Sequence, residues 1–163
     1  DEPGNVAVIP YVSMHGSTDE LVTHLVEALA RKGVTVHEFD LSVTDIGKLA
    51  ITLVDAATIV IATPTVHVGP HPLAAYAAFL ANMLRPKARF ATVIGSYGWS
   101  TKVVEQIGGM SPNMNVELLE PVLCTGRPKE TDFVALDRLA EAIASRHKEH
   151  SLLSPNALRM ESR

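Results

Sequence analysis

The stretch that decides the fold is Ser13-Met14-His15-Gly16-Ser17-Thr18, a hydroxyl-rich turn between an apolar run and a helical pattern. The apolar run predicts a buried strand over Val6–Val12, and the spacing after the turn predicts a helix over Thr18–Arg31. The first N–H groups of a helix have no partners within it, and with the helix dipole they attract anions. The turn contains no Lys or Arg, which suits the phosphate of a bound cofactor better than a transferred phosphate. The simpler alternative is a helix capped by Ser17 or Thr18.

Strand-like and helical patterns alternate along the rest of the chain. Further strands are predicted over Val34–Phe39, Thr58–Thr63, Arg89–Ser96 and Val116–Cys124. Helices are predicted over Asp40–Ala50, Leu73–Leu84, Thr101–Ile107 and Thr131–His147, with a loop over Thr65–Pro72. The expected caps are Ser42 or Thr44 for the second helix and Thr131 or Asp132 for the last, and Pro121 predicts an edge or a bulge in the fifth strand. Such alternation predicts an α/β protein with a parallel sheet covered on both faces, a three-layer α/β/α sandwich.

Composition narrows the function classes. The chain has 163 residues, of which 47% are hydrophobic, and a net charge of -4. We expect one domain over residues 1–150 and a mobile polar tail over 151–163. No basic patch is visible, so nucleic acid is not an expected partner. Cys124 is the only cysteine, so no internal disulfide can form, which fits a reducing cytoplasm. The acidic, turn-like start predicts no signal peptide. The most apolar window, over 66–84, is interrupted by His, Pro and Asn, so no membrane association is expected.

Three loops follow strands at the edge of the sheet where ligands bind. In open parallel sheets, ligands lie beyond the carboxyl ends of the strands. The loops there are Ser13–Thr18, Thr63–Pro72 and Gly95–Ser100. Tyr97 and Trp99 both lie in the last loop, and Trp99 is the only tryptophan. Aromatic side chains in a ligand-facing loop favour a flat ring system, although Trp99 packing over the end of the sheet is the alternative.

Several other chemistries lack their motifs. The first turn has one glycine where a dinucleotide fold has three, and neither a P-loop nor a G-x-S-x-G elbow is present. Ser13 and Thr63 stand where a phospho-acceptor domain needs acidic residues. His67 and His71 flank Gly69-Pro70 in a loop rather than on one helix face, so they form no metal motif, although His15 and His67 could lie near a cofactor. We expect Cys124 to be a buried inert thiol and the surface histidines to be His24, His37, His147 and His150.

Taken together, the loops resemble the flavodoxin domain of flavodiiron proteins, also called A-type flavoproteins. That family has approximately S-M-Y-G-N-T in its first loop, where this chain has Ser13–Thr18. Its third-strand loop reads roughly S-P-T-x-N-x-G before a proline, against Thr63–Gly69 and Pro72 here. The family's L-R-P-K and G-S-Y-G-W-S correspond to Leu84–Lys87 and Gly95–Ser100, which are the most specific matches. The resemblance covers about residues 5–148 and implies a flavodoxin-like sandwich with strand order 2-1-3-4-5.

The resemblance also implies one non-covalent FMN. The phosphate would be held by Ser13, Met14, His15, Gly16, Ser17 and Thr18, and the isoalloxazine ring would be enclosed by Pro64, Thr65, Val66, His67, Val68 and Gly69 together with Ser96, Tyr97, Gly98 and Trp99. Gly69 would provide a flexible peptide near N5 of the ring, because Gly tolerates a positive φ. His67 stands where the family has Asn, and a titrating imidazole there would make the redox potential depend on pH.

The implied role is electron transfer. Flavodiiron proteins also carry a diiron domain with an H-x-E-x-D-H run, which is absent from this sequence. We therefore expect either the flavodoxin part of a longer oxygen or nitric oxide reductase, which the start without Met favours, or a free-standing relative. Expected partners are a rubredoxin-like or NAD(P)H-dependent flavin reductase donor and a diiron domain in a neighbouring subunit of a homodimer. The alternatives are an autonomous flavodoxin, an interaction module that has lost FMN, and a quinone reductase of the same fold.

Overall fold

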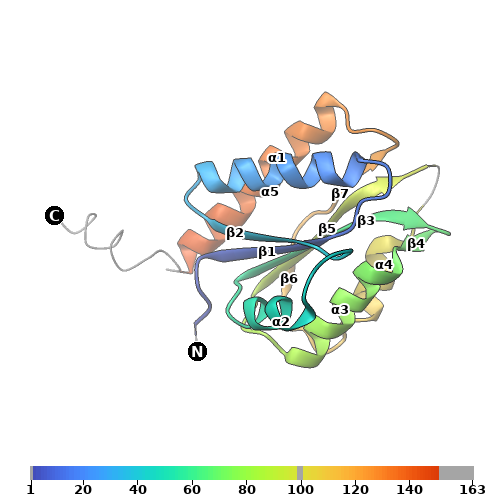
Figure 1. Ribbon diagram of the computed structural model, residues 1–163. Helices are drawn as coiled ribbons and strands as arrows, with labels where there is room; N and C mark the ends of the chain where they lie inside the picture. The colour runs from blue at the N-terminus through green and yellow to red at the C-terminus, as the bar shows by residue number, and fades with distance from the viewer. Residues whose placement is uncertain (1, 99–100, 151–163) are drawn as a thin grey trace.

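A parallel sheet forms the centre of the protein (Figure 1). The computed structural model describes residues 2–98 and 101–150, so Trp99 and the tail over 151–163 lie outside the described residues. The main strands are β1 (Val6–Tyr11), β2 (Thr35–Asp40), β3 (Thr58–Val66) and β5 (Phe90–Tyr97). The fifth strand is made of two pieces, β6 (Glu117–Leu118) and β7 (Val122–Thr125). The order across the sheet is β2-β1-β3-β5-β6, so the predicted order 2-1-3-4-5 is confirmed.

Helices cover both faces of the sheet, as the continuous apolar strands require. One face carries α1 (Ser17–Arg31) and α5 (Glu130–Glu149), and the other carries α2 (Ile46–Val54), α3 (Pro72–Leu84) and α4 (Val103–Gly109) (Figure 1). Side chains of β3 alternate between the two cores: Val60 and Ala62 join the α1/α5 side, whereas Ile59 and Ile61 join the other. The predicted α/β/α sandwich is therefore confirmed. None of the helices within the described ranges is long and apolar enough to cross a bilayer.

The fifth strand is interrupted. Its two pieces, β6 (Glu117–Leu118) and β7 (Val122–Thr125), both pair in parallel with β5. Pro121 lies in the gap and has no N–H to donate to a neighbouring strand. Both pieces lie at the edge of the sheet, so the edge position, one of the two predicted alternatives, is confirmed. The Thr92 hydroxyl donates a hydrogen bond of 2.9 Å to the Leu119 carbonyl, so a side chain satisfies part of the broken ladder.

Two helix starts differ from the predicted caps. The second helix begins later than expected, because the Asp45 carboxylate, rather than Ser42 or Thr44, accepts the Gly47 N–H at 2.8 Å. In α5, Asp132 is already helical, and its carboxylate accepts the Lys129 N–H at 2.8 Å. The predicted cap was Thr131 or Asp132. Asp132 does accept an N–H at this helix terminus, but it lies three positions after the capping residue, which is Lys129.

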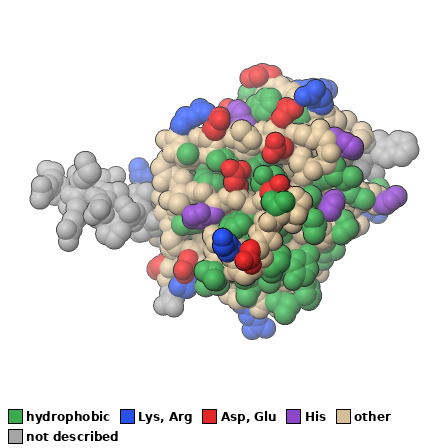
Figure 2. All heavy atoms as spheres, in the orientation of Figure 1, with side chains coloured by type: hydrophobic (Ala, Val, Ile, Leu, Met, Phe, Trp, Pro, Cys, Tyr) green, Lys and Arg blue, Asp and Glu red, His purple; other side chains and the backbone are tan. Residues whose placement is uncertain are grey.

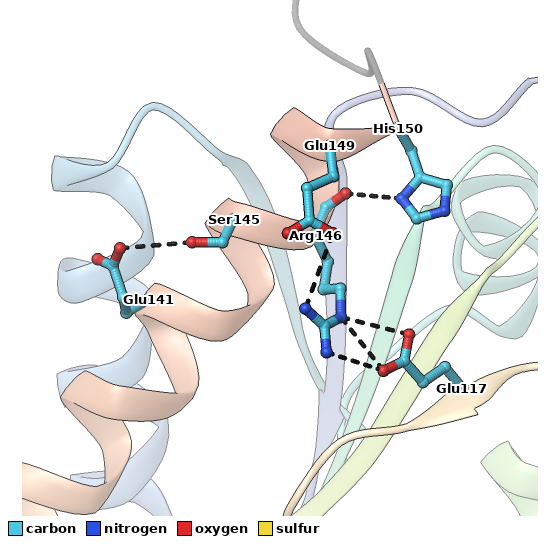
Figure 3. Close-up of polar contacts among 6 residues, drawn as sticks. All are labelled: Glu117, Glu141, Ser145, Arg146, Glu149 and His150. Carbon is cyan, nitrogen blue, oxygen red and sulfur yellow. Dashed lines mark hydrogen bonds and ion pairs between the residues drawn. The ribbon is translucent and has the colours of Figure 1, made fainter.

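The end of α5 is attached to the edge of the sheet. Arg146 donates to both Glu117 oxygens, with Nη2–Oε1 at 3.0 Å and Nε–Oε2 at 3.3 Å, and Figure 3 shows this paired arrangement. The carbonyl of Arg146 also lies 2.9 Å from Nδ1 of His150. These contacts are partly exposed, so they fix the position of β6 more than they stabilise the fold.

His147 is buried, so the prediction that it is a surface residue is wrong. Only 1% of the residue is exposed, because it continues the inward face of α5 onto the sheet. Nε2 lies 2.6 Å from Oγ1 of Thr58, and Nδ1 lies 2.8 Å from Oδ1 of Asn5. The Asn5 amide nitrogen donates to the Gly33 carbonyl, which leaves its oxygen to accept from Nδ1–H. A neutral imidazole with its proton on Nδ1 therefore satisfies both contacts.

The face formed by α2 and α3 exposes large apolar side chains. On α3, Tyr76, Phe79 and Met83 lie at helical spacing and are each about half exposed or more. Ile51 of α2 is 76% exposed. Figure 2 shows hydrophobic side chains gathered over the lower part of this view, where α2 and α3 lie in Figure 1. A contiguous apolar surface of this kind is typical of an interaction site.

Candidate functional site

Strand register brings the three predicted loops together at one edge of the sheet. Beyond β1, the Val12 N–H donates to the Ala62 carbonyl of β3 at 3.1 Å. Thr63 is paired with Gly95, and Pro64 with Ser96, so the ends of β3 and β5 are adjacent. A Cβ on Gly95 would lie 2.0 Å from the Thr63 carbonyl oxygen, which explains why glycine is needed there.

The turn after β1 is closed by Ser13. Its hydroxyl accepts hydrogen bonds from the backbone N–H groups of Gly16, at 3.2 Å, and Asp19, at 3.3 Å. Gly16 has a φ of 86° and occupies the capping position of α1, without a side-chain cap of its own. Ser17 and Thr18 are already helical, so the alternative that either of them caps α1 is wrong. Met14 and His15 are exposed on the outside of this turn.

Thr18 is the unusual residue of this turn. It is 1% exposed, and its hydroxyl oxygen has no hydrogen-bond partner, the one such side-chain atom found within the described part of the chain. A buried hydroxyl without a partner costs about 1–3 kcal/mol, so such groups are rare unless a ligand satisfies them. Because Thr18 lies in the first turn of α1, next to the positive end of the helix dipole, the missing partner would be an anion.

The second predicted loop is a strained hairpin. The expected loop over Thr65–Pro72 is wrong, because β3 continues beyond Pro64 to Val66 and pairs antiparallel with β4 (Gly69–Pro70). The two turn residues, His67 and Val68, have φ values of 48° and 63°. A β-branched residue is disfavoured in this left-handed region, where Asn or Gly is usual. Both side chains are exposed at the end of the sheet, and local strain of this kind is commonly found at ligand sites.

Gly69 is closely packed in this structure. Its φ is not positive, so the left-handed positions of this segment are His67 and Val68 instead. Gly69 is buried against α4, and a Cβ there would lie 2.3 Å from Oε1 of Gln106. Close packing against the end of the Gln106 side chain therefore favours glycine at this position, and the role of Gly69 near the flavin stays a prediction.

The start of α4 holds the hairpin in place, which the sequence alone did not reveal. The Lys102 N–H donates to the Val68 carbonyl at 2.6 Å. Thr65 Oγ1 donates to Thr101 Oγ1 at 2.8 Å, and that oxygen also accepts the Val103 N–H at 3.2 Å. The two threonine hydroxyls are the only sign of this contact in the sequence. Because they lie on separate loops, their proximity could not be predicted without the register of the sheet.

The histidine that follows the hairpin has a structural role. The His71 N–H donates to the buried Thr63 hydroxyl at 3.0 Å, and its ring Nδ1 accepts the Leu73 N–H at 3.1 Å. His71 therefore caps α3 and ties it to the end of β3. No group of three or more His, Cys, Asp or Glu side chains suited to a metal ion occurs among residues 2–98 and 101–150.

The third loop is only partly described. Ser96 and Tyr97 are half-buried and Gly98 is exposed, whereas Trp99 lies outside the described residues. The Tyr97 carbonyl accepts the Gly126 N–H at 2.8 Å. Cys124 beside it on β7 is 1% exposed, and burial raises the pKa of its thiol to about 11, so the prediction of a buried inert thiol is confirmed.

Comparison with known proteins agrees with this geometry. No protein-family model matches the chain. In the solved structure of rubredoxin oxygen:oxidoreductase from Desulfovibrio gigas, 37% of the chain superposes on 91% of this one, with a TM-score of 0.85 and 26% identity. A flavodoxin from the domain Archaea superposes over 99% of its length and 88% of this chain, with a TM-score of 0.75 and 22% identity. This chain is a flavodoxin-like domain.

Sequence relatives connect the flavodoxin-like domain to larger proteins. It is 30% identical to rubredoxin-oxygen oxidoreductase of Megalodesulfovibrio gigas over 147 residues, which are 88% of this chain and 36% of that protein. It is 31% identical to the uncharacterized protein MJ0732 of Methanocaldococcus jannaschii over 130 residues, which are 77% of this chain and 33% of that protein. The chain thus spans about a third of the curated relatives it matches, and it matches the flavodoxin portion of flavodiiron proteins.

Proposed function

We propose that this domain binds one FMN non-covalently and transfers electrons through it. The observation that supports the proposal most strongly is the buried, unpartnered Thr18 hydroxyl at the N-terminus of α1. A flavodoxin-like domain needs an anion site at this turn to bind the cofactor phosphate, and this turn has an unsatisfied donor there.

The residues of the first turn fit a phosphate. Ser13 uses its hydroxyl as an acceptor for two N–H groups and so holds the turn in shape. The Thr18 hydroxyl and the first N–H groups of α1 would donate to the phosphate oxygens. Because the turn has no cationic side chain, these dipoles and neutral donors would carry the interaction.

The other two loops fit a flat ring. The β3–β4 hairpin is held by the contacts of Lys102 and Thr101 with Val68 and Thr65, so the exposed His67-Val68 turn is a preorganised wall. The half-buried Tyr97 lies on the neighbouring strand end. A bound FMN would supply one- and two-electron chemistry, and the domain's residues would orient the ring, exclude water and set its electrostatics.

We further propose that the electrons pass to a diiron domain, in the manner of a flavodiiron oxygen or nitric oxide reductase. Support comes from the similarity to rubredoxin-oxygen oxidoreductase and from the apolar surface of α2 and α3. The side chains of Tyr76, Phe79 and Met83 there would be covered by the diiron domain of the same or a neighbouring subunit. The donor would be a rubredoxin-like protein or a flavin reductase.

A titration tests the cofactor proposal. FMN is added to apoprotein while flavin fluorescence is followed, and the complex is then examined by visible absorption. Saturable quenching at one FMN per chain, with shifted flavin bands, supports the proposal. Absence of binding by a folded sample would leave the interaction module without FMN as the better account.

A further inference from the structure

A large cavity lies on the α4 side of the sheet, away from the predicted cofactor loops. Its volume is about 580 Å³, within the range of small-molecule sites. Ile59, Ile61 and Val93 form its floor on β3 and β5, and Val104 and Ile107 line it from α4. None of the residues predicted to contact FMN lines it.

The cavity exists because two elements are short. The helix α4 ends at Gly108-Gly109, so its last two residues have no side chains to fill the space beneath it. Nothing lies within 4 Å of a Cβ built on either glycine. On the other side, the sheet edge is broken between β6 and β7, where Leu119 and Pro121 line the cavity in place of a continuous strand.

The chemistry of the lining selects the ligand. Most of the lining side chains are apolar, and the Thr92 hydroxyl is already used by the Leu119 carbonyl. Among the described lining residues, Glu120 is the charged one, and its carboxylate disfavours an anion. Leu118 and Glu120 are exposed as well as lining, so the cavity opens to solvent.

We propose that the cavity beneath α4 is a binding site for one small, uncharged, apolar molecule. Burial of apolar surface supplies the affinity, because the lining offers few free polar partners. A dianionic flavin phosphate is a poor occupant, so this site is separate from the proposed FMN site.

Paired dyes and paired variants test the site. The probe is N-phenyl-1-naphthylamine, an uncharged dye that fluoresces in apolar surroundings, and its anionic counterpart is 8-anilinonaphthalene-1-sulfonate. Gly108→Leu fills the cavity from the helix, and Ala91→Phe fills it from β5. Gly109→Leu is the matched control, since it adds the same side chain to the same turn at a residue that does not line the cavity.

In the native chain, we expect saturable binding of one uncharged dye molecule per chain and weaker binding of the anionic dye. The affinity for the uncharged dye should be unchanged in Gly109→Leu and at least tenfold weaker in both filling variants. Thermal unfolding of each variant checks that it is folded, and Ala91→Phe serves if Gly108→Leu is not. Equal binding by folded filling variants would place the dye on another surface, such as α2 and α3, and overturn the proposal. So would a folded native chain that binds no dye.

Discussion

The burial of His147 makes the stability of the fold depend on pH. Burial, with a smaller contribution from the nearby His150, lowers the pKa of His147 to about 4 from the ordinary value of 6.5. The unfolded chain therefore binds a proton at a pH where the folded chain does not. The stability that comes from neutral His147 is fully present above pH 6.5 and is lost as the pH falls from there toward 4.

The size of the effect follows from the two pKa values. A shift of one pKa unit corresponds to about 1.4 kcal/mol, so the full difference is about 3 kcal/mol. Between pH 7 and pH 5, His147 accounts for a loss of about 2 kcal/mol in the free energy of unfolding. His147→Gln removes the ionisable ring, so this part of the pH dependence disappears even though the variant loses stability at pH 7.

Urea unfolding at pH 7 and pH 5 measures the effect in the native chain, His147→Gln and the control His37→Gln. His37 is an exposed histidine on β2, so its replacement keeps the native pH dependence. The reasoning is refuted if His147→Gln loses as much stability between the two pH values as the native chain does.

Two glycine substitutions and one turn substitution test the geometry of the site. Gly95→Ala places a Cβ 2.0 Å from the Thr63 backbone oxygen and costs about 3 kcal/mol or more. Gly69→Ala costs only about 1 kcal/mol, because the Gln106 side chain can rotate away, and adding Gln106→Ala to Gly69→Ala recovers that loss. Urea unfolding measures these costs, and equal costs for the two glycine substitutions would contradict this prediction. Val68→Gly relieves the left-handed strain and raises the free energy of unfolding by about 1 kcal/mol, and a fall in urea midpoint would show that Val68 is unstrained.

The α/β class could be predicted from sequence because strand-like runs alternate with helical patterns, whereas the order of the strands came from the resemblance to flavodiiron proteins. His147 continues the buried stripe of Leu136, Ala140 and Ile143 at helical spacing, which is one signal in favour of its burial. A histidine at the end of a helix with basic neighbours suggests a solvated turn, and the partners that satisfy it, Thr58 and Asn5, are distant in sequence. Burial of this ring therefore needed tertiary information.

The hairpin after β3 could not be predicted from sequence, for a local reason. A two-residue turn with two left-handed residues normally has Asn-Gly, whereas this one has His67-Val68. Pro64 also suggests the end of a strand, yet β3 continues through it because the pairing with β5 persists to that position. Tertiary contacts from α4 hold the hairpin in place, and no local sequence pattern predicts these contacts.

The position of the first turn could be predicted from sequence, but the separate structural roles of its residues could not. The resemblance gave six residues the same role, whereas Ser13 stabilises the turn and Thr18 carries the unsatisfied donor. A hydroxyl-rich sequence predicts an anion site, but the three-dimensional structure is needed to separate the residue that shapes the turn from the one that would bind the anion.

The most direct test compares Thr18→Val with the native chain, using FMN and riboflavin, which lacks the phosphate. Thr23→Val, on the exposed side of α1, is the control. A hydrogen bond to a charged group contributes about 1.5–3 kcal/mol, so Thr18→Val should weaken FMN binding about 10- to 100-fold, leave riboflavin binding unchanged and not lower the stability of the apoprotein. Equal weakening for both flavins, or unchanged FMN affinity, would contradict a phosphate site at Thr18.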